Sequence, residues 1–224
     1  MKISKTDIEI ILKGLKNCIF EELSEDNYYN QVIKLADEEV FDMEKWASGA
    51  TKIVLFPRKK DFVVKIPFEG EIENGDFLFF RGAAEPQGWN YCEVEKILFA
   101  KAEKENFSQF FLQTEYIGDV HGYPIYIQEI GTILEEVKLN DYDLNLTESE
   151  KMRNSEIRKM CSKRMIRCFN ATWIADFIDY YTEETFFKLG NFLKENWISD
   201  LHSENIGYSI TGAPVIIDYA SYHS

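Results

Sequence analysis

The sequence predicts an α+β fold, and three features of its 224 residues indicate it. Apolar residues recur with helical spacing over residues 6–23. Short runs of β-branched and aromatic residues, separated by turn residues, dominate residues 44–130. Capped helical segments then follow from residue 147 to a final β-hairpin. We therefore expect a small antiparallel sheet with one crossing helix, joined to a shortened group of helices that ends in the hairpin.

Composition restricts the class of function. The net charge of −14 argues against general nucleic-acid affinity, and many of the acids lie in mixed-charge helices. This leaves an acidic inhibitor of a nucleic-acid enzyme as a minor alternative. No apolar run has membrane-spanning length and no signal-peptide pattern is present, so we expect a cytoplasmic protein without a membrane partner. The four cysteines form no CxxC pair and predict reduced, structural thiols.

The first half of the chain is expected to contain an N-terminal helical extension over residues 1–43, with helices at 6–23 and 28–36. Strands are expected within residues 44–130, which should also hold one helix. The expected strands are 53–56, 62–66, 110–118 and 123–129, the helix is 91–104, and a long loop covers 67–89 with an apolar piece at 77–80.

The second half is expected to be helical. Thr147 opens a helix that runs to about residue 168, Asn170 or Thr172 caps a second, and Thr182 caps a third that reaches Asn196.

The C-terminal hairpin carries the strongest functional signal. Strands at 206–210 and 214–218, joined by a turn at 211–213, would bring Asn205 beside Asp218, with Asp200 close by. Two carboxylates and an amide oxygen can hold Mg²⁺ and orient a hydroxyl group. These are the needs of phosphoryl transfer.

Asp200-Leu201-His202-Ser203-Glu204-Asn205, with Asp218 further on, resembles the catalytic loop and metal-binding Asp of the protein-kinase-like superfamily. It is most similar to the aminoglycoside and choline kinase branch. The resemblance spans about residues 44–221. It implies that Asp200 is the catalytic base, that Asn205 and Asp218 bind Mg²⁺, and that His202 supports the loop.

The resemblance also implies a phosphate-binding lysine and its partner. Lys65, in Val63-Val64-Lys65-Ile66, matches the strand lysine that contacts the α- and β-phosphates of ATP. Its partner is Glu95 or Glu93 on the helix at 91–104. We favour Glu95 because Leu98 and Ala102 share its face at i+3 and i+7. An exposed lysine and two solvated glutamates are the alternative.

Two further segments match the family by position. Ser48 and Gly49 occupy the place of the phosphate-covering loop, although a single Gly is equally typical of a plain turn. Gln128, Glu129 and Ile130 fall at the hinge whose backbone faces adenine in the family. No special side chain is expected at this hinge. The division between lobes, 44–130 and 131–224, should lie near it.

The sequence departs from the family in three places. Ile198 replaces the usual His two positions before Asp200, and Tyr219-Ala220 replaces Phe-Gly after Asp218. The chain stops six residues after Asp218, so the second lobe is expected to be truncated.

From these residues we expect a kinase, a phosphotransferase that uses ATP and Mg²⁺. A small-molecule acceptor is favoured over a protein because the peptide-binding platform of protein kinases is missing. The alternative is a non-catalytic kinase-like module that binds an unknown protein partner.

Overall fold

The structure is a computed structural model, and it describes residues 3–18, 32, 34–48, 52–67, 69–73, 76–80, 90–134 and 146–220. For Ser48 and for residues 69–73 and 76–80 it describes the backbone only. The chain divides into two compact units. The first contains Met1–Ile97 and Gln113–Glu129, and the second contains Leu98–Leu112 and Ile130–Ser224. Across the described ranges, no helix combines the length and the apolar character needed to cross a membrane.

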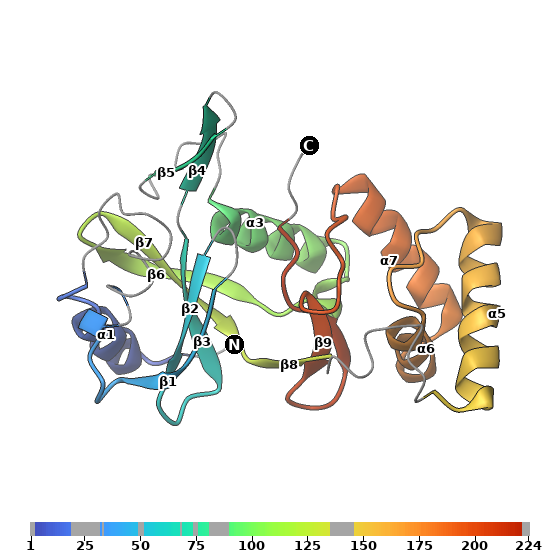
Figure 1. Ribbon diagram of the computed structural model, residues 1–224, viewed down its shortest axis with the longest axis horizontal. Coiled ribbons are helices and arrows are strands. Elements are labelled where there is room, and N and C mark those ends of the chain that lie inside the picture. Colours follow the sequence, from blue (N-terminus) through green and yellow to red (C-terminus); the bar gives the residue numbers. More distant parts are fainter. Residues whose placement is uncertain are drawn as a thin grey trace. The chain divides into compact units, whose positions relative to one another are not determined.

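The first unit is built on a five-stranded antiparallel sheet with the order β1-β2-β3-β7-β6 (Figure 1). Its strands are β1 (Phe41–Ser48), β2 (Lys52–Pro57), β3 (Phe62–Pro67), β6 (Thr114–Val120) and β7 (Tyr123–Glu129). Residues 46–48 form the end of β1, because Trp46 pairs with Leu55 and Ser48 pairs with Ile53.

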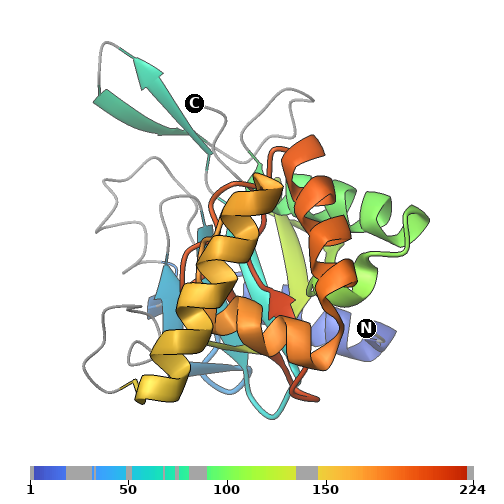
Figure 2. The same cartoon turned by 90° about the vertical axis from the view of Figure 1, so that its right-hand side faces the viewer.

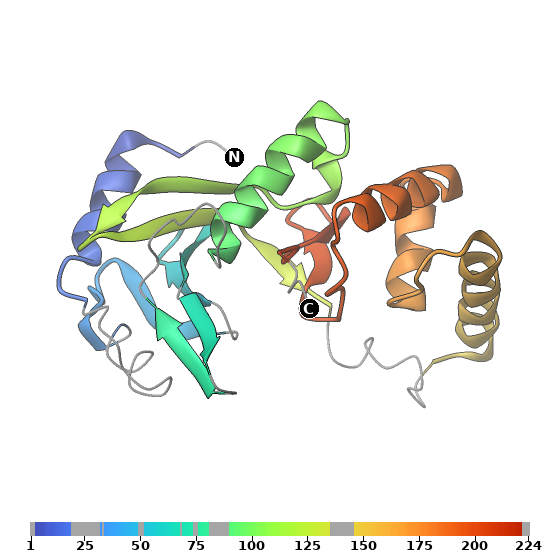
Figure 3. The same ribbon diagram turned by 90° about the horizontal axis from the view of Figure 1, so that it is seen from above.

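The two faces of this sheet differ in chemistry because side chains alternate along each strand. On one face Ile53, Val64 and Ile127 are fully buried. They share an apolar core with Ile11 of helix α1 (Lys5–Gly14), which lies beside β6 (Figure 3). The opposite face carries polar side chains, including Lys65, and faces helix α3 (Tyr91–Lys104).

The expectation of a long loop over residues 67–89 is wrong in part. Strands β4 (Glu69–Glu73) and β5 (Asp76–Phe80) form a two-stranded antiparallel sheet there. Glu73 pairs with Asp76, which leaves only Asn74-Gly75 between the strands in sequence. Asn-Gly is the preferred dipeptide of two-residue hairpins, so the sequence did contain the signal.

The second unit contains three helices that follow one another in contact, α5 (Glu148–Arg164), α6 (Ala171–Tyr180) and α7 (Glu183–Glu195) (Figure 2). Each helix begins after an expected capping residue. The side chains of Thr147, Asn170 and Thr182 each accept a hydrogen bond from the backbone N–H three residues later. Glu150 completes a capping box with Thr147.

Helix α5 is shorter than expected. It ends at Arg164 because Met165 adopts a left-handed conformation with φ of 56°, which terminates a helix. The helices enclose an aromatic core in which Trp173, Phe177 and Phe186 are fully buried.

A three-stranded sheet completes the second unit, in the order β10-β9-β8. Its strands are β8 (Gly131–Ile133), β9 (Ile206–Ser209) and β10 (Pro214–Ile216), and a short 3₁₀ helix, η1 (Ser108–Phe110), contacts β10. The hairpin β9–β10 lies within the predicted range. Gly212 in its turn has φ of +81°, a conformation that favours glycine.

Gly207 in β9 is the position most sensitive to added volume in this sheet. A Cβ at this position would lie 2.1 Å from the backbone oxygen of Thr132. The Gly207 carbonyl accepts a hydrogen bond from Trp173 Nε1 at 3.0 Å. Because backbone would have to move, we expect Gly207→Ala to lower the free energy of unfolding by about 2–4 kcal/mol in urea titrations. Gly212→Asn is the control and should cost less than about 1 kcal/mol, since Asn tolerates positive φ. Equal losses in the two variants would contradict this packing.

Candidate functional site

A buried ion pair connects β3 to α3 in the first unit. Lys65 Nζ lies 3.0 Å from Glu95 Oε1 and 2.9 Å from Glu95 Oε2. Lys65 is 3% exposed and Glu95 is 0% exposed. The structure therefore brings together the two residues that the sequence analysis paired, and neither is the solvated side chain of the alternative interpretation.

Glu95 has three further polar neighbours, none of which the sequence analysis associated with it. Lys52 Nζ of β2 lies 2.9 Å from Oε1, and Thr114 Oγ1 of β6 donates to Oε2 at 2.9 Å. Gln128 Nε2 of β7 donates to Thr114 Oγ1 at 2.9 Å and lies 3.5 Å from Glu95 Oε2. We call Lys52, Lys65, Glu95, Thr114 and Gln128 the Glu95 cluster.

Strand register explains why these side chains meet. Val54 pairs with Lys65, so Lys52, two residues before Val54, lies on the same face of the sheet. In the same way Thr114 pairs with Gln128, and Gln128 lies two residues beyond Tyr126, the partner of Lys65. Four strands thus present polar groups to one position on α3.

The cluster is possible only because its members satisfy one another. An isolated buried carboxylate or ammonium is costly, and proteins bury such charges when they are paired and hydrogen-bonded. A carboxylate offers about four acceptor sites, and the contacts to Glu95 occupy both of its oxygens.

Glu93, the other candidate partner, makes different contacts. Its carboxylate accepts a hydrogen bond from Tyr126 Oη at 2.9 Å and pairs with Lys96 at 2.6 Å. Burial, and then the hydrogen bond to Glu93, raises the pKa of the Tyr126 hydroxyl well above its usual value. Glu93 therefore anchors Tyr126, whereas Glu95 is the carboxylate that contacts Lys65.

The candidate phosphate-covering segment lies between β1 and β2. Ser48 is the last residue of β1, and only residues 49–51 separate it from Lys52, the first residue of β2. Gly49 lies outside the described residues.

The candidate hinge residues have separate environments. Gln128 is 1% exposed and its side chain belongs to the Glu95 cluster, so the expectation that no side chain matters there is wrong. The Glu129 amide donates to the Gln113 carbonyl at 3.2 Å, and Ile130 is the first residue of the second unit after β7.

The second unit contains the loop from Asp200 to Asn205 and the residue Asp218. Asn205 Nδ2 donates to the Asp200 carbonyl at 2.7 Å, which closes the loop. The Asn205 carbonyl in turn accepts hydrogen bonds from the amides of Ile217 at 2.8 Å and Asp218 at 3.2 Å. The backbone therefore holds Asn205 next to Asp218 at the open end of the hairpin.

The Asp200 carboxylate is accessible to solvent. Its side chain is 47% exposed, and His202 Nε2 lies 3.8 Å from Asp200 Oδ2. His202 Nδ1 also accepts a hydrogen bond from the Glu204 amide at 3.3 Å, a contact within the loop.

The two departures next to this loop are both part of the apolar core. Ile198 is 4% exposed and packs with the aromatic core of the second unit. Tyr219, after Asp218, is 1% exposed; its hydroxyl donates to the Leu112 carbonyl at 2.8 Å and its ring packs against Phe111. Packing at Ile198 and Tyr219 thus fixes the segments that carry Asp200 and Asp218.

The described residues contain no group of three or more His, Cys, Asp and Glu side chains arranged to hold a metal. Asn205 and Asp218 are the two residues that the kinase resemblance assigns to Mg²⁺, and each has a side-chain oxygen. Because Asn205 Nδ2 is bonded to the Asp200 carbonyl, its Oδ1 is the atom that remains to face a cation. Mg²⁺ commonly binds through one or two protein oxygens together with substrate phosphates, and this pair fits that pattern.

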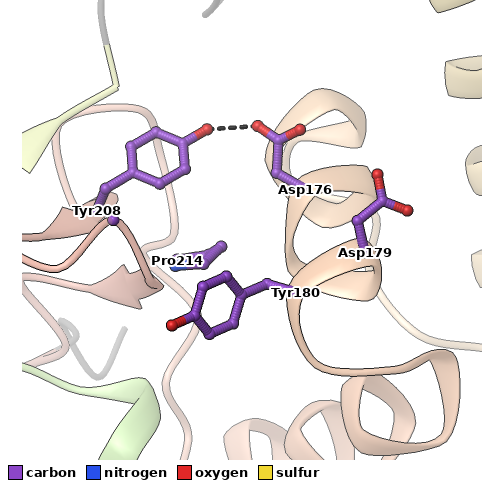
Figure 4. Close-up of a pocket in the computed structure, with 6 residues that line it drawn as sticks. Asp176, Asp179, Tyr180, Tyr208 and Pro214 are labelled. Carbon is purple, nitrogen blue, oxygen red and sulfur yellow. Dashed lines mark hydrogen bonds between the residues drawn. The ribbon is translucent and has the colours of Figure 1, made fainter.

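A separate, open pocket of about 350 Å³ lies at the closed end of the hairpin (Figure 4). Its walls include Asp176, Asp179 and Tyr180 of α6, together with Tyr208 and Pro214. The Tyr208 hydroxyl donates to Asp176, as Figure 4 shows. Two carboxylates repel phosphate, and the pocket is at the opposite end of the hairpin from Asn205, so we assign it no part in nucleotide binding.

Comparison with known proteins identifies no family for this chain. No family model and no curated protein matches the chain. Among solved structures, an aminoglycoside phosphotransferase from Alicyclobacillus acidocaldarius subsp. acidocaldarius DSM 446 is similar at a TM-score of 0.31 and 12% identity. The alignment covers 79% of this chain and 61% of that one. A likeness this weak supports no conclusion about fold or function.

The Glu95 cluster generates a stability prediction. Glu95→Gln removes the negative charge that both Lys52 and Lys65 contact, and losing one partner of a buried ion pair typically costs about 3–5 kcal/mol. We expect a loss of that size in the free energy of unfolding, measured by urea titration. Glu103→Gln, at an exposed position of the same helix, is the control and should change stability by less than about 0.5 kcal/mol. A Glu95→Gln variant as stable as the control would show that the cluster does not hold α3 to the sheet.

Proposed function

We propose that this chain is an ATP- and Mg²⁺-dependent phosphotransferase with a protein-kinase-like fold and a small-molecule acceptor. The observation that carries the proposal is the buried contact between Lys65 and Glu95, at 2.9 Å. The resemblance of Asp200, Asn205 and Asp218 to a kinase catalytic loop supports it.

The first unit would contribute the phosphate-binding lysine. Glu95 fixes the Lys65 ammonium, so that it loses little conformational freedom when it meets a phosphate. The surrounding burial lowers the local dielectric and strengthens the attraction between an ammonium and phosphate oxygens. The cluster contains two ammonium groups, of Lys52 and Lys65, and one carboxylate, and this local excess of positive charge would offset the net charge of −14, which otherwise opposes nucleotide binding.

The second unit would contribute the metal ligands and the base. Asn205 Oδ1 and the Asp218 carboxylate would hold Mg²⁺, which when bound neutralises charge on the phosphate oxygens. Asp200, exposed in its loop, would accept the proton of the acceptor hydroxyl as that oxygen bonds to the γ-phosphorus. The bond from the γ-phosphorus to the β-phosphate oxygen breaks, and ADP leaves with that oxygen.

Nucleotide binding is the first test. With ATP and Mg²⁺ at a hundredfold excess over Kd, binding should stabilise the chain by about 2.7 kcal/mol, which corresponds to a melting-temperature rise of about 5–10 °C. EDTA should remove most of this rise, and Asp218→Asn should have the same effect. No shift at millimolar ATP would defeat the nucleotide-binding part of the proposal.

Turnover is the second test. Asp200→Asn should lower ATP turnover about 10²–10⁴-fold, because a general base is lost, and should leave the ATP-dependent thermal shift intact. Glu204→Gln, exposed in the same loop, is the control and should retain full turnover. If the wild-type chain binds ATP but shows no turnover above Asp200→Asn, the chain is instead a non-catalytic nucleotide-binding module.

A further inference from the structure

Lys52 is a second buried lysine in the Glu95 cluster. It is 5% exposed, and its Nζ lies 2.9 Å from Glu95 Oε1. Lys65 Nζ lies 3.0 Å from the same oxygen. Two ammonium groups from neighbouring strands are thus within hydrogen-bond distance of one carboxylate oxygen.

Lys52 supplies the second contact to Glu95 Oε1, the oxygen that Lys65 also reaches. Lys65 already contacts both carboxylate oxygens, and Thr114 donates to Oε2. Burying an additional ammonium has a large desolvation cost, and a buried lysine is uncommon unless it is paired or functional. Glu95 instead holds two ammonium groups side by side, and such a pair of cations can contact neighbouring oxygens of a phosphate chain.

The position of Lys52 in the chain also points to a ligand. It lies three residues after Gly49, which the kinase resemblance assigns, together with Ser48, to the phosphate-covering loop. Lys65 is the phosphate-binding lysine of the proposed function. The polar face of the sheet thus holds Lys52 beside Lys65.

We propose that Lys52 is a second phosphate-binding residue, and that Lys52 and Lys65 together bind the phosphate chain of a nucleoside triphosphate. This inference rests on the proposed function and extends it. Glu95 orients both ammonium groups, and a chain of phosphates offers each of them an oxygen. Two separate ammonium groups favour a polyphosphate over a ligand without phosphate, because each phosphate contact is charge-assisted.

Calorimetric titration of the full chain with ATP and Mg²⁺, and with adenosine, tests the inference. Lys52→Met should weaken ATP binding about tenfold or more, as expected for a lost hydrogen bond between charged groups. Adenosine affinity should stay unchanged, which a loss of structure alone would not produce. Lys52→Arg keeps the charge and should recover most of the affinity. Lys45→Met is the matched control and should bind like the wild type, since Lys45 is an exposed lysine of β1.

The outcomes separate the two proposals. If Lys52→Met binds ATP as the wild type does, the role of Lys52 is wrong and the proposed function stands. If the wild-type chain binds no ATP, the proposed function fails and this inference fails with it.

If circular dichroism shows that Lys52→Met does not fold, the inference can be tested by NMR on the wild-type chain. In chain labelled with ¹³Cε-lysine, with signals assigned from Lys52→Arg and Lys65→Arg, ATP and Mg²⁺ should shift both lysine signals and adenosine should shift neither. A shift of the Lys65 signal without the Lys52 signal would overturn the inference.

Discussion

The burial of the Glu95 carboxylate is the constraint on which the rest of the first unit depends. Its contacts reach Lys52 of β2, Lys65 of β3 and Thr114 of β6, and Gln128 of β7 completes the cluster. One side chain of α3 therefore fixes that helix against four strands. Because a buried charge is tolerated only with this degree of pairing, the cluster also fixes where two ammonium groups lie.

The sequence predicts the contact between Lys65 and Glu95, but not the other three members of the cluster. Lys65 and Glu95 could be predicted because a strand lysine and an inward-facing helix glutamate each leave a local pattern. Lys52, Thr114 and Gln128 could not be assigned without the register that pairs β2, β6 and β7 with their neighbours. A single sequence gives the alternation of each strand, but not which strands are adjacent.

The second unit shows the same division between local and tertiary information. The caps of its helices and the hairpin that brings Asn205 beside Asp218 follow from short-range sequence signals. The hydrogen bond from Asn205 Nδ2 to the Asp200 carbonyl and the burial of Tyr219 depend on packing that no local pattern reveals. The hairpin β4–β5 differs from these cases, because the dipeptide Asn74-Gly75 is a local sequence signal that predicts it.

The central claim, that the buried lysines meet the phosphates of a nucleotide, can be measured directly with an ATP derivative that carries a lysine-reactive acyl phosphate. Peptide mass spectrometry would identify the acylated residue after brief reaction of the native chain. The account predicts acylation of Lys65 or Lys52 that excess ATP and Mg²⁺ suppress. Acylation confined to exposed lysines such as Lys45, or unaffected by ATP, would contradict it.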